Sequence, residues 1–558
     1  MRSHLQALLA HAVEKTALGE KLSTTELPPL LLEPPKQREF GDLSSNVAML
    51  WAKGAKRPPR VLAEAILKNI DDADRILARK EIAGPGFLNF AFAPKFYFER
   101  LREIAADKNL RLNIGQGQKV QVEFASVNPT GPLHVGHGRV AVIGDVLARL
   151  HEATGFAVER EYYVNDAGHQ MDNLGLSLYA RYRELFGEVV ELPEGGYPGE
   201  YLKDLALQVK VREGDKYLHE SKETAVKFFR EFGGVALLDT IRRQLGEFGI
   251  HFDSYFSEKA MRERSEVAES MERLRQLGLL YSQDGAEWYR STQFGDDKDR
   301  TVIKSDGELT YFAADIAYHR NKFERKFAKL INVWGADHHG YVPRLKAAMQ
   351  GLGYDAQRLQ VVLVQMVQLT RGGEPVRMGK RTGEFVSLEE VLEEVGRDAA
   401  RFFFLMRKSD SHLDFDLELA KKQSSDNPVF YVQYAHARIA SIFEQAAKSG
   451  IARGPDDTIF VERLELAEEL ELVRQMIQFH DVVEESVREL EPHRLVFYLL
   501  EFAGEFHRYY NRHRVVSEDR ELSRARLLLL DNVQKTIRRG LEILGVTAPY
   551  KMANRAEA

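Results

Sequence analysis

The chain has 558 residues, with 44% hydrophobic and 29% charged residues, the composition of an ordinary globular protein, and this length predicts roughly three or four domains. The net charge of −6 requires any nucleic acid to bind through local basic patches, and the lack of cysteine excludes disulfides and thiolate metal sites. No apolar run approaches the roughly 20 residues of a membrane span, and the absence of cysteine fits an intracellular protein, so we expect a cytoplasmic location.

Residues 1–112 predict a small α+β domain. The first residues, "MRSHLQALLAHAVEK", have the pattern of an amphipathic helix and not of a signal peptide. Asp42 or Ser44 is a candidate cap for a following helix, and the prolines of "RPPRVLAEAILKNI" predict the start of another. "GPGFLNFAF" is typical of a turn followed by a strand.

Residues 118–411 predict an α/β domain built on a doubly wound parallel sheet of the Rossmann type. The segment "VQVEFAS" has a strand pattern, a loop of prolines and glycines follows, and a helix then runs to Gly155 before the strand "AVEREYYVND". Two further strands are predicted in "KLINVWGAD" and "LQVVLVQMVQL". Between them and the first pair, residues from about 170 to 290 read as a mainly helical insertion.

Residues 412–558 predict an all-α helical bundle. Leu466, Leu470, Val473 and Ile477 recur at helical spacing, and the segments 493–510 and 522–544 have the same periodicity. No internal repeat interrupts this pattern.

The loop "VNPTGPLHVGHGR" is the first candidate site. It follows a predicted strand and precedes a helix, where the backbone N–H groups of the helix start attract phosphate oxygens. His134 and His137 could donate hydrogen bonds to phosphates, and Gly136 would let a base approach the backbone. A metal site or a pair of capping histidines is the alternative, but no cysteine or closely spaced carboxylate supports a metal, and we expect none.

The string "PLHVGH" resembles the HIGH motif of class I aminoacyl-tRNA synthetases, and the full loop is similar to that of the arginyl-tRNA synthetases. The resemblance extends over nearly the whole chain. It implies a ligase that uses ATP, with Mg²⁺ on the nucleotide, to activate L-arginine and to transfer it to the 3′ end of tRNA(Arg). In such an enzyme His134 and His137 hold the triphosphate and Gly136 seats the adenine.

Residues 377–380, "RMGK", resemble the mobile KMSK loop of the same family. Alone, this cationic, glycine-rich segment would be typical of a solvated surface loop. The resemblance implies that Lys380 is the catalytic cation and that Arg377 and Met378 also contact ATP. Arginine and glycine replace the first lysine and the serine of the family pattern, which leaves the contribution of the first position open.

A selective arginine pocket should present carboxylates to the guanidinium group. Acidic residues at predicted strand ends are candidates, although each could instead be a helix cap or a surface charge. The resemblance implies that Tyr311 and Asp315 bind the guanidinium, with further residues around the α-amino and carboxylate groups or elsewhere in the pocket: Glu123, Ser126, Asn128, His134, Asp337 and Gln365. Such a pocket rejects analogues that lack the polar end, so no editing domain is expected.

Two regions are candidates for tRNA contact. "EFHRYYNRHRVV" mixes basic and aromatic residues, including Arg508, Tyr509 and Arg512, a combination suited to phosphates and unpaired bases, although the tyrosines could belong to the core. By resemblance, Phe87 and Asn89 of the N-terminal domain would meet a base of the tRNA D-loop, and Phe87 could equally be buried.

Three other functions remain open. Another class I synthetase is the nearest, but cysteine recognition would need thiolate or zinc ligands and glutamate recognition a basic pocket. A nucleotidylyltransferase would share the histidine motif without needing the bundle. A tRNA-binding protein without activity would not need His134, His137 and Lys380 together. The family is usually monomeric, and we expect a monomer here.

Overall fold

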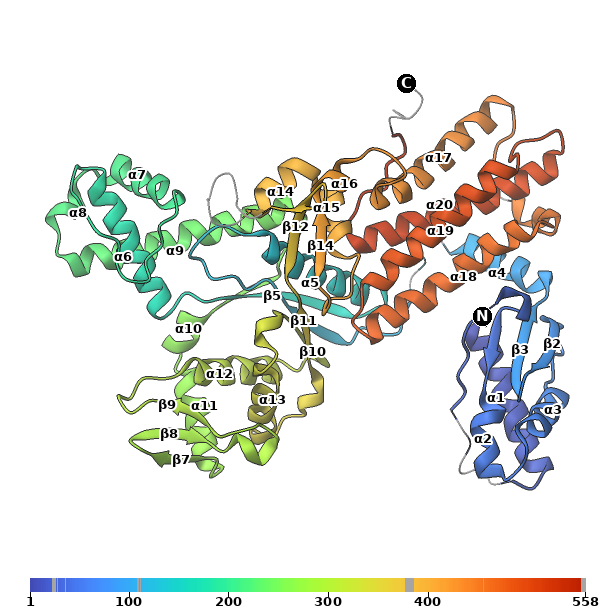
Figure 1. Ribbon diagram of the computed structural model, residues 1–558, viewed down its shortest axis with the longest axis horizontal. Helices are drawn as coiled ribbons and strands as arrows, with labels where there is room; N and C mark the ends of the chain where they lie inside the picture. The colour runs from blue at the N-terminus through green and yellow to red at the C-terminus, as the bar shows by residue number, and fades with distance from the viewer. Residues whose placement is uncertain are drawn as a thin grey trace.

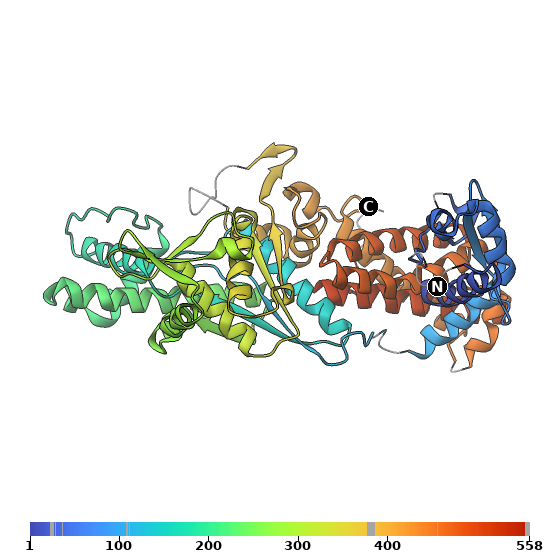
Figure 2. The same cartoon turned by 90° about the horizontal axis from the view of Figure 1, so that it is seen from below.

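The computed structural model describes residues 1–22, 27, 29–35, 37–107, 110, 112–376, 386–454 and 456–552, without the side chains of Ser3 and Arg38. The molecule is elongated (Figures 1 and 2). A helical arm lies at one end, a five-stranded sheet lies in the middle, and a helical bundle follows. The N-terminal unit lies beyond the bundle, away from the sheet. Among the described residues, no helix has both the length and the apolar character needed to span a bilayer.

The N-terminal unit packs its helices on an antiparallel sheet of order β1-β3-β2. Leu88, Phe90 and Phe92 of the central strand are buried, because alternate side chains of a strand face the same layer. Strands β1 and β2 were not predicted; β1 has only three residues. The elements are α1 (Arg2–Gly19), η1 (Arg38–Phe40), β1 (Leu43–Ser45), α2 (Val47–Ala55), α3 (Pro59–Asn69), β2 (Leu77–Ala83), β3 (Phe87–Phe92) and α4 (Pro94–Ala106).

The central sheet is parallel throughout and has the order β11-β10-β4-β5-β6, which confirms the predicted doubly wound fold. The chain leaves β4 toward β5 on one side and later returns to β10 on the other, so the strand order reverses beside β4. A ligand site is expected at the carboxyl ends of the strands at this point. The elements are β4 (Lys119–Glu123), α5 (Val135–Ala153), β5 (Ala157–Val164), β6 (Ser254–Ser257), α12 (Tyr311–Glu324), β10 (Lys329–Gly335), η3 (Ala336–His338), α13 (Tyr341–Gly351), η4 (Ala356–Arg358) and β11 (Leu359–Val364).

The predicted single insertion is in fact two excursions from the sheet. Helices α6 (His169–Glu184), α7 (Tyr201–Glu213), α8 (Lys216–His219) and α9 (Lys222–Glu247) form the arm, and β6 then returns to the sheet. This strand was missed because its four residues, all half-buried, show no alternation of apolar and polar side chains. The second excursion contains α10 (Glu258–Glu263), α11 (Glu266–Gln276), η2 (Ser291–Phe294) and the antiparallel strands β7 (Leu280–Gln283), β8 (Ala286–Tyr289) and β9 (Arg300–Ile303).

The predicted strand "LQVVLVQMVQL" is two strands in two different sheets. It breaks after β11, and β12 (Val367–Arg371) pairs with β13 (Glu374–Pro375) and β14 (Leu413–Asp416). Because β14 lies beyond residue 412, the all-helical region starts later than predicted. The following elements are α14 (Leu388–Val395), α15 (Arg397–Phe404), α16 (Leu417–Lys421), α17 (Pro428–Lys448), η5 (Asp457–Arg463), α18 (Ala467–Arg488), α19 (His493–Arg512) and α20 (Arg520–Leu544).

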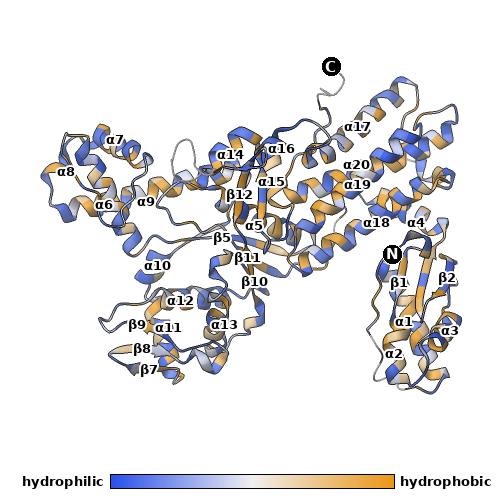
Figure 3. Cartoon of the chain, viewed as in Figure 1, coloured by the Kyte–Doolittle hydropathy of each residue, from blue (hydrophilic) through white to orange (hydrophobic). Residues whose placement is uncertain are grey.

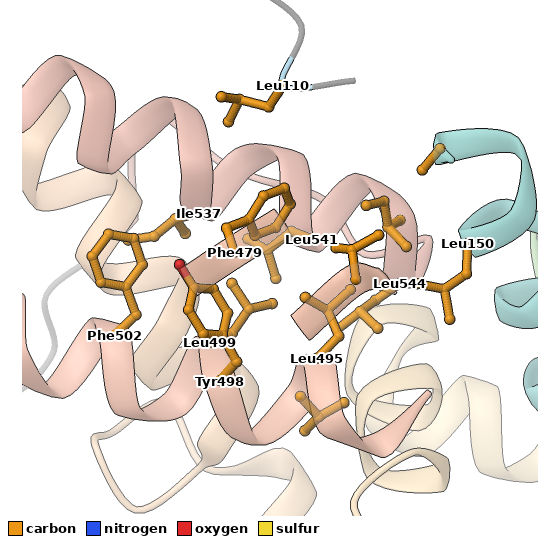
Figure 4. Packing of buried hydrophobic residues seen from close by; sticks show 14 of the residues in the cluster. Leu110, Leu150, Phe479, Leu495, Tyr498, Leu499, Phe502, Ile537, Leu541 and Leu544 are labelled. Atoms are coloured by element: carbon orange, nitrogen blue, oxygen red, sulfur yellow. The ribbon is translucent and has the colours of Figure 1, made fainter. Parts of the chain in front are cut away.

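The core of the bundle is continuous with the core of the α/β domain. Each bundle helix carries both hydrophobic and hydrophilic residues (Figure 3). Phe479, Leu499 and Leu541 of three different helices pack together, and Leu150 of α5 lies close to the end of α20 (Figure 4). The N-terminal unit is attached to the same bundle, since Lys535 Nζ donates a hydrogen bond of 2.7 Å to the carbonyl of Asp107.

A buried arginine joins the two regions. Arg401 Nη2 is ion-paired with Asp145 Oδ2, and its other nitrogens donate to the carbonyls of Leu544 (3.0 Å) and Phe248 (3.2 Å). Arg401→Ala should lower the free energy of unfolding by about 3–5 kcal/mol, because the buried carboxylate of Asp145 loses one of its cationic partners. Chemical denaturation measures this loss, and replacing the exposed Arg407 by alanine is the control. A change below 1 kcal/mol on Arg401→Ala would contradict the bridging role.

Candidate active site

One large cleft of about 2070 Å³ lies at the carboxyl ends of β4, β10 and β11, where the strand order reverses. It brings together residues that are up to 266 positions apart in the sequence, from Glu123 to Glu389. The sequence-predicted residues that line it are Glu123, Ser126, Asn128, His134, Gly136, His137, Tyr311, Asp315, Asp337 and Gln365.

The two histidines of the first motif form the start of α5. His134 is the N-cap, and its Nδ1 accepts hydrogen bonds from the backbone N–H groups of Gly136 (3.1 Å) and His137 (3.4 Å). His137 Nδ1 in turn accepts from the backbone N–H of His134 at 3.3 Å. The two rings stack with centroids 3.4 Å apart. The histidines are thus capping residues, one of the alternatives above, and they also line the cleft.

This arrangement sets the chemistry of both imidazoles. Because each Nδ1 accepts a hydrogen bond, each ring carries its proton on Nε2. Burial lowers the pKa of His134, and burial together with the neighbouring His134 lowers the pKa of His137 to about 3. Both rings are therefore uncharged N–H donors at neutral pH, placed beside the partial positive charge of a helix start.

Gly136 lies tightly against the capping imidazole of His134. A Cβ at this position would lie 3.0 Å from Cε1 of His134 and 3.1 Å from its Nδ1. These contacts are tight, so a side chain here would require the capping imidazole to shift slightly.

Asp315 and Tyr311 lie one turn apart on α12, as predicted for a helical segment. Tyr311 is 59% exposed, whereas Asp315 is half-buried at the inner wall of the cleft. Burial raises the pKa of Asp315 to about 7; a hydrogen bond from Tyr341 opposes this rise, and Glu258 and Glu123 add to it. Among the described residues, no lysine or arginine forms an ion pair with Asp315. Within the described part of the chain, the carboxylate of Asp315 is therefore not neutralised by an ion pair, which suits a cationic ligand.

Glu123 already has a cationic partner. The fully buried Lys322 donates to Glu123 Oε2 at 2.8 Å and to Asn332 Oδ1 at 2.7 Å, and Ser126 Oγ donates to Glu123 Oε1 at 3.0 Å. Ser126 has a backbone φ of +39°, a left-handed conformation that costs about 1–3 kcal/mol for a residue other than glycine. Glu123 thus holds the strained loop after β4 in place.

The other residues predicted for the arginine pocket also line the cleft that contains Glu123 and Asp315. Asn128 Nδ2 donates to Gln170 Oε1 at 2.6 Å. Asp337 lies on η3 with an exposed side chain. The backbone of Gln365 is fixed from both sides, since its carbonyl accepts from the buried Arg139 and its N–H donates to the carbonyl of Ser409, both at 2.8 Å.

Sequence reasoning missed three residues that line the cleft, Gln170, Glu258 and Tyr341, and the buried Lys322 that is bonded to Glu123. Glu258 follows the short strand β6, which was itself missed. Tyr341 is the first residue of α13, and the two hydrogen-bond partners of Lys322, Glu123 and Asn332, lie on β4 and β10. The only available signal was the position of Glu258 and Tyr341 just after the strands β6 and β10.

The second motif lies outside the described residues, so the structure does not place Arg377, Met378 or Lys380. The residue that follows the undescribed segment is Val386, whose carbonyl accepts a hydrogen bond of 3.3 Å from the N–H of Val135. Ser387 forms an isolated β-bridge with His134. The chain after the second motif therefore returns directly to the first.

The candidate tRNA contacts differ in exposure. Tyr509 is fully buried and donates to Glu469 at 3.2 Å, so its predicted contact with tRNA is wrong, because the ring belongs to the core. Arg508 and Arg512 have exposed side chains. Phe87 is 39% exposed, but Asn89 is buried, which leaves almost none of its side chain for a base.

Three family models match successive parts of the chain. They are the arginyl tRNA synthetase N terminal domain over residues 3–92, the catalytic domain of class I tRNA synthetases (R) over 100–413, and the DALR anticodon binding domain over 432–552. An arginine–tRNA ligase of Citrifermentans bemidjiense is 50% identical over 555 residues, which cover 99% of this chain and 100% of that protein.

Solved structures agree with these matches. A crystal structure from Campylobacter jejuni has a TM-score of 0.76 at 36% identity, covering 83% of this chain and 100% of its own. The arginyl-tRNA synthetase of Thermus thermophilus has a TM-score of 0.78 at 22% identity over 99% and 100% of the two chains, which shows a common fold. The chain is 50% identical to the Citrifermentans bemidjiense protein over 99% of its length, and the catalytic-domain model matches more than half of it. The chain therefore belongs to the arginyl-tRNA synthetase family.

Proposed function

We propose that this chain joins L-arginine to the 3′ end of tRNA(Arg) in two steps within one cleft. The observation that carries the proposal is the combination of two uncharged imidazole donors at a helix start with an acidic wall that contains Asp315. The first suits the phosphates of ATP and the second suits a guanidinium group.

The chemistry needs no nucleophilic side chain. An oxygen of the arginine carboxylate attacks the α-phosphate of ATP, the bond to pyrophosphate breaks, and arginyl-adenylate forms. The 2′-hydroxyl of the terminal adenosine of tRNA then attacks the carbonyl carbon, and AMP leaves. Alignment of the reactants and stabilisation of the developing negative charge supply the catalysis.

The nucleotide would lie over the start of α5. His134 and His137 would donate to its phosphates, with the adenine beside Gly136. Lys380, with Arg377 and Met378, is assigned from the resemblance to supply the cationic side of the site, and the return of the chain at Val386 supports this. Mg²⁺ would arrive bound to the phosphates of ATP; among the described residues, no group of three or more His, Asp or Glu could hold a metal ion.

The arginine would extend inward from the nucleotide. Tyr311 and Asp315 would contact the guanidinium group, with Glu258 adding negative charge. Ser126, Asn128 and His134 would lie near the α-amino and carboxylate groups, where Glu123 acts through the loop that it holds. Asp337 and Gln365 would line the outer wall.

The tRNA would contact the bundle through Arg508 and Arg512 and the N-terminal unit through Phe87. Phe87→Ala should raise the KM for tRNA about tenfold with little effect on kcat, since base stacking on an aromatic ring contributes about 1–3 kcal/mol. Steady-state aminoacylation at varied tRNA concentration measures this. Leu18→Ala, which removes another exposed apolar side chain of the same unit, is the control. Equal KM values for both variants would remove Phe87 from the interface.

An aminoacylation assay with a panel of amino acids and total tRNA tests the function. We expect charging with arginine alone, and arginine-dependent exchange between pyrophosphate and ATP when tRNA is present. Charging with lysine or glutamate in place of arginine would overturn the assignment. We also propose a cytoplasmic, monomeric enzyme; light scattering at a mass near 63.7 kDa would support the monomer.

A further inference from the structure

Tyr341 is the first residue of α13 and lines the cleft beside Asp315. Its hydroxyl donates a hydrogen bond to Asp315 Oδ2. From this geometry we propose that Tyr341 is a positioning residue for arginine: its hydrogen bond orients the Asp315 carboxylate toward the guanidinium group and favours the ionised form of that carboxylate. The inference rests on the proposed function, which places the guanidinium at Asp315.

The tyrosine ring is held on several sides. Its centroid lies 6.0 Å from that of Phe312 and 6.2 Å from that of Trp334, both in edge-to-face orientations. The guanidinium of Arg344, one turn later on α13, lies 4.9 Å from the ring centroid. The hydroxyl is therefore presented at a fixed point of the wall. A rigid donor orients a carboxylate more precisely than water does.

One oxygen of Asp315 remains for the ligand. Among the described residues, Tyr341 is the only group that donates a hydrogen bond to the Asp315 side chain. A phenol has a single proton to donate, and that proton is used on Oδ2. The other oxygen, Oδ1, is left to accept from a guanidinium N–H, and the phenol oxygen can accept a second one.

The charge of Asp315 is balanced by groups from five elements. Glu123 of β4 and Glu258 of α10 disfavour its ionisation, and Tyr163 of β5 faces the same space. Lys322 of α12 and Tyr341 of α13 favour ionisation. Burial is the largest influence, and the resulting pKa of about 7 places the titration of Asp315 in the physiological range. Removing one favourable contact therefore changes the charged fraction at neutral pH.

Tyr341→Phe removes the hydroxyl and keeps the ring. Loss of a hydrogen bond to the ionised carboxylate should raise the pKa of Asp315 by about one unit. We therefore expect the KM for arginine at pH 7 to rise about tenfold. The KM for ATP should not change. At pH 9 Asp315 ionises without help, so the arginine KM of the variant should return to within about threefold of wild type.

The experiment is aminoacylation with tRNA(Arg) at pH 6–9, together with calorimetric titration of arginine in buffers of different ionisation enthalpy. Wild type should release about half a proton on binding arginine at pH 7, because about half of Asp315 is protonated at its pKa, and the variant should release more. Tyr354→Phe is the matched control, since Tyr354 donates to Glu324 at 3.1 Å outside the cleft. Thermal melting verifies folding.

Three results would overturn the inference. An unchanged arginine KM in Tyr341→Phe would remove the residue from the pocket. An equal rise at pH 7 and pH 9 would remove its effect on ionisation, as would wild-type binding without proton release. Failure of the proposed function looks different, because wild-type enzyme would then not charge tRNA with arginine at any pH.

Discussion

Asp315→Asn should raise the KM for arginine by about 10²–10³, because it removes the charge that faces the guanidinium, and losing one partner of a buried charge pair costs about 2–5 kcal/mol. The KM for ATP should stay close to that of wild type. Steady-state aminoacylation with each substrate varied in turn separates the two effects. An arginine KM within threefold of wild type would move the guanidinium site elsewhere in the cleft.

The same variant should be more stable than wild type above neutral pH. The pKa of Asp315 is raised in the folded state from 3.8 to about 7, so the folded protein holds a proton that the unfolded chain has lost between these values. The contribution of Asp315 to the free energy of unfolding therefore falls as the pH rises from about 4 to 7. Above pH 7 this loss of stability is fully present. Melting temperatures of Asp315→Asn and wild type should differ most at pH 8 and converge near pH 4.

The exposed Asp239, paired with Arg242, provides the matched control. Asp239→Asn should change neither the arginine KM nor the pH dependence of melting. If Asp315→Asn melted at a lower temperature than wild type at pH 8, the carboxylate would stabilise the fold. It would then not be a group that lowers stability and is retained because it binds the substrate.

His137→Ala should slow arginyl-adenylate formation by about 10²–10³, the loss expected when one fixed donor to a developing anion is removed. Because the pKa of His137 is about 3, the ring acts as an uncharged donor, and its contribution should not vary between pH 6 and 8. Pyrophosphate exchange at saturating arginine and tRNA measures the rate.

Lys380→Ala should slow the same step by a similar factor, through loss of a full positive charge. His339→Ala removes an exposed imidazole that does not line the cleft and should leave the rate unchanged. Normal exchange in both the His137 and Lys380 variants would exclude these residues from the mechanism.

Local sequence predicted the elements that carry their own signals. The run from "VQVEFAS" to Gly155 has a strand pattern, a turn and an apolar helix, and the structure contains β4 and α5 there. The helices of the bundle follow from periodicity. Strand β6 could not be predicted, because four half-buried residues have no pattern until β5 lies beside them. The same limit explains β14, which exists only through its pairing with β12.

The sequence by itself determined the domain order, the doubly wound class and the family, because motifs such as "PLHVGH" and helical periodicity are properties of neighbouring residues. Tertiary structure alone decided which ionisable groups lie close enough to change one another's pKa. Burial raises the pKa of Asp315 to about 7; Glu258 and Glu123 add to the rise, and Tyr341 and Lys322 oppose it, although these four residues belong to four different elements. Burial and charge–charge interaction depend on distance in space, and no local pattern encodes that distance.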